Sequence, residues 1–140
     1  MSGQRAPGAE LSVSDYRLLS DFRHVLRKFF VFSEESARRA KITPQQHRAL
    51  LEIKAFNGQP TVGDLANRLV IKPHSAVGLA DRLVRAELVV RNPDPSDRRR
   101  VTLALTANGE EKLLAVSGAN RRELRRLAPL LNAVVAQLER

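Results

Sequence analysis

The chain has 140 residues, with 24 Lys and Arg against 15 Asp and Glu, and its formal net charge is +9. This length is typical of a single domain, and a hydrophobic fraction of 43% is enough for a packed core, which excludes disorder throughout. The chain has no cysteine and only three scattered histidines, which excludes disulfides, thiolate chemistry and cysteine metal sites, so we expect no metal and no cofactor.

Charged residues interrupt every apolar stretch before it reaches the roughly 20 residues that a membrane-spanning helix needs. The N-terminal residues lead into no apolar signal-peptide core, and we expect residues 1–12 to fray. A cytoplasmic location is therefore expected. The positive charge fits either simple solubility or a polyanionic partner such as nucleic acid, because neutralising phosphates releases counterions.

A long helix is predicted from Ser14 to about Arg39, where apolar residues recur at spacings of three and four. Ser14 is the expected N-cap, and Asp15 in the first turn favours the helix dipole. Aromatic side chains at this spacing indicate either a core or subunit interface, or the wall of a ligand pocket. They are Phe22, Phe29, Phe30 and Phe32.

Two shorter helices are predicted next. The first begins at the Thr43-Pro44 cap and ends at Asn57-Gly58. Within it, His47 is expected to be solvated or hydrogen-bonded on a charged face. Thr61-Val62-Gly63-Asp64 opens the second, and Val70-Ile71-Lys72 is expected to form the turn that follows.

A further helix is predicted from Pro73 to about Ala86. The periodicity places one stripe of small and aliphatic residues inward: Ala76, Ala80 and Leu83, with Val77, Leu79 and Val84 beside it. The opposite side of the helix carries His74, Ser75, Gly78 and Arg82.

The pattern then changes to β. Residues 88–91 are short and β-branched, and residues 101–105 alternate at the period of a strand. Between them, residues 92–100 contain two prolines and several turn formers, so we expect a hairpin with a long loop and Arg98-Arg99-Arg100 at its tip. Thr106 then caps a final helical region, which Pro129 is expected to divide into two helices.

Two short helices joined by a tight turn and followed by a basic hairpin predict a helix-turn-helix with a wing. The helix from Pro73 is slim enough for the major groove of DNA, and its exposed small residues allow close approach. An arginine of the hairpin could then enter the flanking minor groove, where A·T-rich stretches have an enhanced negative potential. Asp97 stands two residues before Arg99 and could orient its guanidinium.

The run from Asp94 to Gly109, with its Asp97-Arg98-Arg99 and Leu105-Thr106-Ala107-Asn108-Gly109 segments, resembles the wing signature of the MarR family of bacterial transcription regulators. Residues 61–69, 79–83 and 43–46 resemble the helix-turn-helix of the same family and the helix before it. The resemblance implies a mainly α winged helix-turn-helix, with dimerisation helices over residues 14–42 and 107–140 and a DNA-binding part over 43–106.

The resemblance also implies a homodimeric repressor on a pseudo-palindromic operator, released by a small ligand. It assigns Arg99 to the minor groove and Asp97 to its orientation. The early recognition-helix positions are Lys72, His74, Ser75 and Gly78; we add Arg82, Arg98 and Arg100 as DNA-binding candidates. A ligand pocket is expected between the first helix and the winged part, with walls from Phe22, Phe29, Phe30 and Phe56.

Two positions depart from the family pattern, because Val70 and Glu87 stand where glycine is common. Glu87 must adopt a left-handed conformation or end the helix differently. Gly78 within a helix costs about 1 kcal/mol relative to Ala, so either close approach to DNA or tight packing must account for it.

No nucleophile, metal cluster or phosphate loop accompanies the acidic residues, so an enzyme is not expected. The alternatives to a specific regulator are an architectural protein that binds DNA without sequence choice and a ligand-binding module with no role on DNA.

Overall fold

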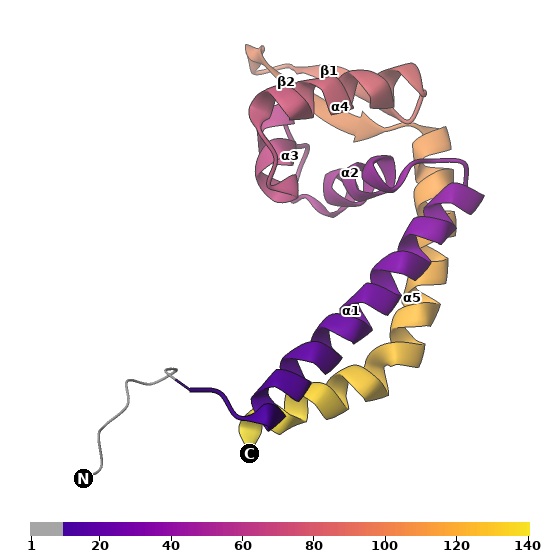
Figure 1. The fold of residues 1–140 in the computed structure, drawn as a ribbon. Helices are drawn as coiled ribbons and strands as arrows, with labels where there is room; N and C mark the ends of the chain where they lie inside the picture. Colours follow the sequence, from indigo (N-terminus) through magenta and orange to yellow (C-terminus); the bar gives the residue numbers. More distant parts are fainter. Residues whose placement is uncertain (1–9) are drawn as a thin grey trace. The chain divides into compact units, whose positions relative to one another are not determined.

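A computed structural model describes residues 10–140, which form five helices and one two-stranded antiparallel hairpin (Figure 1). This confirms the expected fold class, a mainly helical chain with a small β-wing. The element order is α1 (Val13–Arg39), α2 (Pro44–Ala55), α3 (Val62–Leu69), α4 (Pro73–Arg85), β1 (Val89–Asp94), β2 (Asp97–Leu105), α5 (Ala107–Ala136) and a final 3₁₀ turn, Gln137–Glu139. Among the described residues, no helix is long and apolar enough to cross a membrane.

The described residues divide into two compact units. One contains the chain up to Phe32 together with Asn120–Arg140, and the other is Ser33–Ala119. Residues 1–9, part of the segment expected to fray, lie outside the described residues. The division into dimerisation helices and a DNA-binding part stays a prediction.

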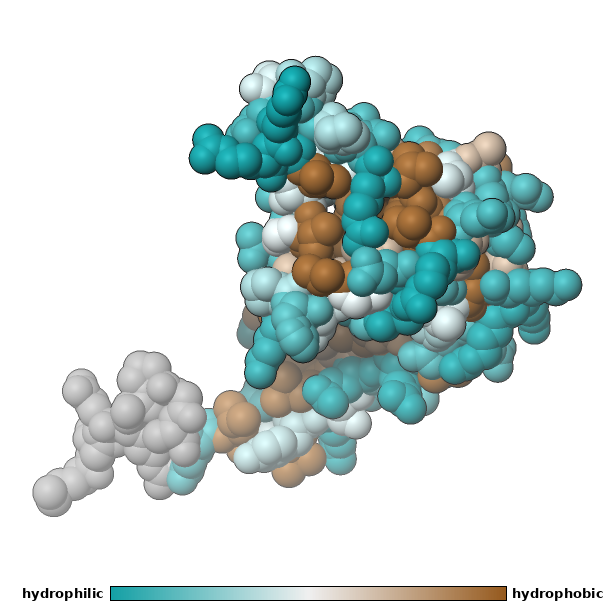
Figure 2. Space-filling model, turned by 90° about the horizontal axis from the view of Figure 1, so that it is seen from above, coloured by the Kyte–Doolittle hydropathy of each residue, from teal (hydrophilic) through white to brown (hydrophobic). Residues whose placement is uncertain are grey.

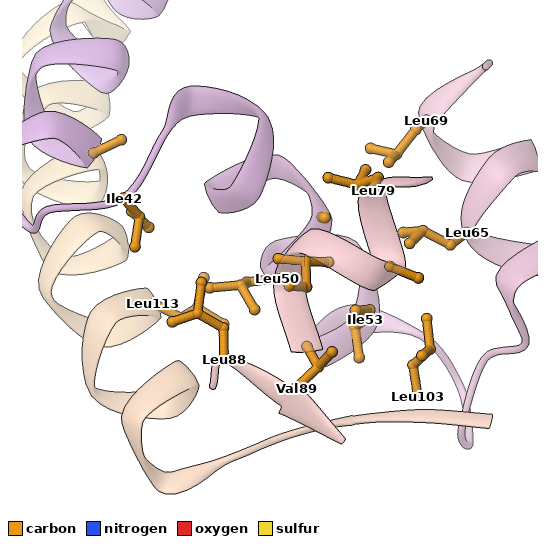
Figure 3. Packing of buried hydrophobic residues seen from close by; sticks show 14 of the residues in the cluster. Ile42, Leu50, Ile53, Leu65, Leu69, Leu79, Leu88, Val89, Leu103 and Leu113 are labelled. Atoms are coloured by element: carbon orange, nitrogen blue, oxygen red, sulfur yellow. The ribbon is translucent and has the colours of Figure 1, made fainter. Parts of the chain in front are cut away.

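The core of the Ser33–Ala119 unit gathers aliphatic side chains from its helices and from both strands (Figure 3). The largest fully buried leucines are Leu50, Leu65, Leu79, Leu83, Leu88 and Leu103. On α4, Ala76, Ala80 and Leu83 are buried as predicted. Leu79 is buried with them, whereas Val77 is 49% exposed and lies outside the inward stripe.

The helix starts follow from local capping. Thr43 with Gln46, and Thr61 with Asp64, each form a reciprocal capping box, in which both side chains accept a backbone N–H of the first turn. The first helix differs from the prediction. Ser12 Oγ accepts from the Asp15 N–H at 3.1 Å and Asp15 Oδ2 accepts from the Ser12 N–H at 2.8 Å, so Ser12 rather than Ser14 is the N-cap.

The prediction that Pro129 divides the C-terminal region is wrong, because α5 continues through it. Proline removes one helical N–H donor and crowds the preceding turn. Apolar packing holds the helix on both sides of this defect, since Leu127 and Val134 are buried against Val25 of α1. Tertiary contact therefore outweighs the local cost at Pro129.

The hairpin also differs from the prediction, because its strands extend through most of the expected loop and only Pro95-Ser96 remain between them. Pro93 pairs with Val101, but Asp94 pairs with Asp97, so the register shifts at this point. Arg98, Arg99 and Arg100 are the extra residues of β2 at this shift. The three arginines therefore lie along one irregular strand beside the turn and do not form a loop tip.

The residues that replace common glycines adopt the left-handed conformation, with φ of 56° at Val70 and 59° at Glu87. Glu87 thus adopts the left-handed conformation and does not end the helix in another way, which is the first of the two outcomes expected for it. A β-branched residue is particularly strained there.

Val70→Gly is expected to raise the free energy of unfolding by about 1 kcal/mol, because glycine removes the left-handed strain. Val70 is 89% exposed, so its side chain adds little packing that the substitution could remove. Denaturant unfolding measures the change, with Gly58→Ala as the control. Gly58 has φ of +94° and open space around it, so that variant should be destabilised by backbone strain alone. A Val70→Gly variant less stable than wild type would contradict the assigned strain.

Candidate nucleic-acid interface

The exposed side of α4 carries the residues that the sequence assigned to DNA. His74, Ser75 and Arg82 are exposed, Gly78 is partly buried, and Lys72 is exposed at the N-cap just before the helix. A Cβ built at Gly78 would meet only Arg82 Nη1, at the ordinary contact distance of 3.5 Å. Tight packing within the chain therefore does not explain this glycine, and close approach to DNA stays a prediction.

Gly78→Ala is therefore expected to stabilise the fold by about 1 kcal/mol, because alanine has the higher helix propensity and a Cβ fits. The same variant should bind DNA several-fold more weakly if the helix approaches the bases closely. Thermal unfolding and a binding titration on the same preparation separate the two effects. Unchanged DNA affinity together with higher stability would show that Gly78 has no role in close approach.

Arg82 is held at one edge of this surface. Its Nη2 donates to Gln45 Oε1 at the start of α2, at 3.3 Å. The opposite edge is tied to the hairpin, because Arg91 Nη2 of β1 donates to Asp81 Oδ1 of α4 at 2.5 Å. Both pairs are partly open to solvent, with 37% of the Arg91 side chain and 49% of the Asp81 side chain exposed, so their role is to orient the side chains rather than to supply much stability.

Arg99 is the most accessible of the wing arginines for which an ion pair is resolved, with 95% of its side chain exposed. Asp97 Oδ1 accepts from the Arg99 backbone N–H at 3.0 Å and lies 3.7 Å from Arg99 Nε. The carboxylate thus contacts both the main chain and the base of the guanidinium. This is the geometry expected of an orienting partner, and it leaves the terminal nitrogens of Arg99 free of Asp97.

Arg100, unlike Arg99, lies close to carboxylates of two other elements. Its Nε lies 3.5 Å from Asp94 Oδ2 on β1, and its Nη2 lies 4.0 Å from Asp64 Oδ2 at the start of α3. The pKa of Asp64 is lowered first by the Thr61 N–H and further by Arg100. Hydrogen bonds from Ser96, followed by the Arg100 charge, lower the pKa of Asp94. Arg100 therefore joins the wing to α3 through two carboxylates that stay ionised at neutral pH.

Sequence reasoning missed the partners Gln45, Asp64, Asp81, Arg91 and Asp94. Apart from Asp94, whose partner Arg100 is on the same hairpin, each has a partner that is distant in the sequence, by 10 residues for Arg91 and Asp81 and by 37 for Arg82 and Gln45. The one local signal was Asp94, because Asx residues before a serine commonly bond their own turn. Asp94 Oδ1 indeed accepts from both the N–H and the hydroxyl of Ser96.

The four phenylalanines assigned to a pocket fall into different units. Phe22, Phe29 and Phe30 belong to the unit that contains the start of α1, and Phe56 belongs to the other. Phe29 packs in the apolar cluster with Val25, and its ring meets Phe30 edge-on at 5.9 Å between centroids. Phe22 and Phe30 remain 38% and 55% exposed, so the pocket stays a prediction.

His47 is not on a solvated face, contrary to the prediction. It is only 4% exposed, and its Nε2 has no hydrogen-bond partner among residues 10–140. The reason is the packing of α2, which buries His47 together with Ala49, Leu50 and Ile53. Burial lowers the pKa of His47 from its ordinary value of 6.5, so the folded protein holds this imidazole neutral.

Folding stability is therefore expected to fall as the pH drops below about 6.5, because the unfolded chain then binds a proton that the folded chain excludes. Chemical unfolding at pH 7.5 and 5.5 measures this loss. His47→Leu should remove most of the difference, whereas His74→Leu, at an exposed position, should retain it. Equal pH dependence in wild type and His47→Leu would contradict this origin.

A slim helix with an open face, preceded by a short helix and followed by a basic hairpin, defines the class of winged helix-turn-helix proteins (Figure 1). Comparison with known proteins agrees. A model of the MarR family matches residues 40–100. The fold is similar to that in the crystal structure of RV1404 from Mycobacterium tuberculosis, with a TM-score of 0.74. The two sequences are 29% identical, and the match covers 94% of this chain and 95% of that one.

Curated relatives give the same assignment. The chain is 38% identical over 94 residues to the HTH-type transcriptional regulator FarR of Neisseria gonorrhoeae, which is 67% of this chain and 56% of FarR. It is 30% identical to the uncharacterized HTH-type transcriptional regulator YsmB of Bacillus subtilis, over 74% of this chain and 70% of YsmB. The chain thus belongs to the MarR family, and these relatives are named as regulators of transcription rather than as enzymes.

Proposed function

We propose that this chain is a sequence-specific, double-stranded DNA-binding regulator that acts as a homodimeric repressor in the cytoplasm. One observation carries the proposal. The open face of α4 stands beside a hairpin whose Arg99 is exposed and contacted by Asp97, and this hairpin is tied to both α3 and α4. These contacts support a surface in which helix and wing act on one DNA molecule together.

In this proposal α4 enters the major groove, which admits one helix. Lys72, His74, Ser75 and Arg82 then contact base edges or phosphates, and Gly78 allows the close approach. Arg99 enters the flanking minor groove, and Arg98 neutralises a phosphate. Arg100 is reassigned from a DNA contact to a positioning residue, because two carboxylates already engage it.

Exposed apolar residues support a homodimer. Most of the large apolar side chains that remain exposed belong to the unit formed by the start of α1 and the end of α5, and contiguous apolar exposure marks interaction surfaces. A second copy of the chain would cover them. They include Val13, Tyr16, Leu19, Phe30, Leu130 and Leu138. Phe22 and Phe30 also offer apolar contact to a small-molecule effector that would release the protein from DNA.

Selection of bound duplexes from a random DNA pool tests the proposal. We expect a pseudo-palindrome whose half-sites lie about one helical turn (~34 Å) apart, because a two-fold dimer presents two recognition helices. A pool that yields bound DNA without a shared motif would replace the specific regulator by an architectural DNA-binding protein. Failure to retain any DNA at low salt would favour the remaining alternative, a ligand-binding module with no role on DNA.

A further inference from the structure

We infer that Val77 reads DNA sequence, by contacting the 5-methyl group of a thymine in the major groove on the side of α4 nearest the wing. The inference rests on the proposed function and adds one chemical contact to it. Val77 was expected to lie beside the buried stripe of α4, yet it is 49% exposed. Its exposure therefore needs an explanation other than the core.

The helical period places Val77 on one edge of the open face of α4. Residues advance by about 100° each, so the buried Ala76, Leu79, Ala80 and Leu83 set the inward direction. His74 and Gly78 then lie near the middle of the opposite face. Ser75 and Arg82 occupy the edge toward α2, where Arg82 bonds Gln45. Val77 occupies the other edge, on the side of Asp81, which Arg91 of β1 holds.

Packing does not account for this position. Val84, seven residues after Val77 and on the same side of the helix, is partly buried against the core, whereas Val77 is not part of that cluster. The face seen from above, which carries α4 and the hairpin, shows apolar patches set between strongly hydrophilic side chains (Figure 2). An exposed apolar side chain at the edge of the open face of α4 is suited to an apolar group of the partner.

The major groove offers one apolar group that distinguishes a base, the methyl group of thymine. Adenine is usually read by an Asn or Gln side chain, and α4 contains neither residue. The hydroxyl of Ser75 can hydrogen-bond the bases of either pair, so for α4 the group that marks an A·T pair most distinctly is the thymine methyl. Val77 supplies branched methyl groups at the edge where such a contact would form.

The probe is the duplex that the 140-residue chain recovers from the random pool, synthesised with each thymine in turn replaced by deoxyuridine. This change removes one methyl group and preserves base pairing. We expect at least one thymine in each half-site at which the wild type loses about fourfold in affinity, the equivalent of one buried methyl. Val77→Ala should bind the thymine and deoxyuridine duplexes equally, and it should fold because the position is half-exposed and alanine favours helices.

Val90→Ala is the matched control, because Val90 of β1 is 43% exposed but lies off α4. It should keep the wild-type preference for thymine. Equal wild-type affinity for all duplexes would overturn the inference while leaving specific binding, and so the proposed function, intact. A thymine preference that persists in Val77→Ala would overturn it too, and would assign the methyl contact to another residue such as the exposed Pro73. Recovery of no specific duplex would overturn the proposed function and the inference together.

Discussion

Gly109→Ala is expected to lower the free energy of unfolding by about 3 kcal/mol, and the melting temperature by about 10 °C. A Cβ at Gly109 would stand 2.1 Å from the Leu88 carbonyl oxygen and 3.1 Å from its carbon. No rotation relieves this clash, because the obstacle is backbone. The glycine at position 109 is therefore explained by close contact between the start of α5 and the backbone of Leu88, which follows α4.

Neighbouring hydrogen bonds prevent Leu88 from moving away. Its carbonyl oxygen accepts from the Thr106 N–H, and its own N–H donates to the Leu83 carbonyl, both at 3.0 Å. The Thr106 hydroxyl donates to the Glu87 carbonyl at 2.6 Å and accepts from the Gly109 N–H at 3.0 Å. The joint between α4, the hairpin and α5 is thus a set of shared backbone contacts that an added methyl would break.

Gly63→Ala is the matched control for Gly109→Ala. Both residues lie in the first turn of a helix, but a Cβ at Gly63 would meet only Thr61 Oγ1, at 3.7 Å. This variant should be as stable as the wild type or slightly more stable. Calorimetry measures the melting temperatures of the two variants. A Gly109→Ala variant as stable as Gly63→Ala would refute the close contact between Gly109 and the Leu88 backbone.

Arg99→Ala is expected to reduce affinity for the selected duplex at least tenfold, because the minor-groove interaction removed from each half-site is worth about 1–2 kcal/mol. The preference for A·T pairs flanking the half-sites should disappear at the same time. Asp97→Asn should show part of both effects, since the guanidinium remains but its carboxylate partner does not. Binding titrations on duplexes with A·T or G·C flanks measure both quantities.

Alanine variants of two other arginines distinguish a minor-groove contact by Arg99 from a general effect of removing positive charge. Arg98→Ala should weaken binding to all sequences alike and reduce the salt slope by about 0.9 for each phosphate that is no longer neutralised. Arg122→Ala, at an exposed position of α5, should leave the flank preference unchanged. If Arg99→Ala behaves like Arg98→Ala, with weaker binding but an intact A·T preference, Arg99 contacts phosphate and does not read the minor groove.

Local signals in the sequence were sufficient where one short segment determines the structure. Thr43-Pro44 and Thr61 predicted their helix starts, because a capping side chain and its partner lie within four residues. The hairpin and the inward residues of α4 followed from periodicity. The candidate DNA-binding residues of α4 could be placed on one face for the same reason.

Local signals failed where distant contacts decide the outcome. Pro129 does not end its helix, because Val25 packs against the residues around it, and α2 buries His47 within the core. Pro93 and Pro95 suggested a loop, but pairing of β1 with β2 continues to Asp94 at the cost of a register shift. The partners of Arg82 and Arg100 are likewise on other elements, so no spacing in the sequence could reveal them.

One titration measures specific binding by a dimer most directly. The 140-residue chain is added to the selected duplex and, separately, to a duplex of the same length and composition in scrambled order, at one fixed salt concentration. We predict two chains per selected duplex and an affinity at least about a thousandfold above that for the scrambled duplex. Equal affinity for the two duplexes, or saturation at one chain per operator, would contradict the proposal of a dimeric, sequence-specific regulator.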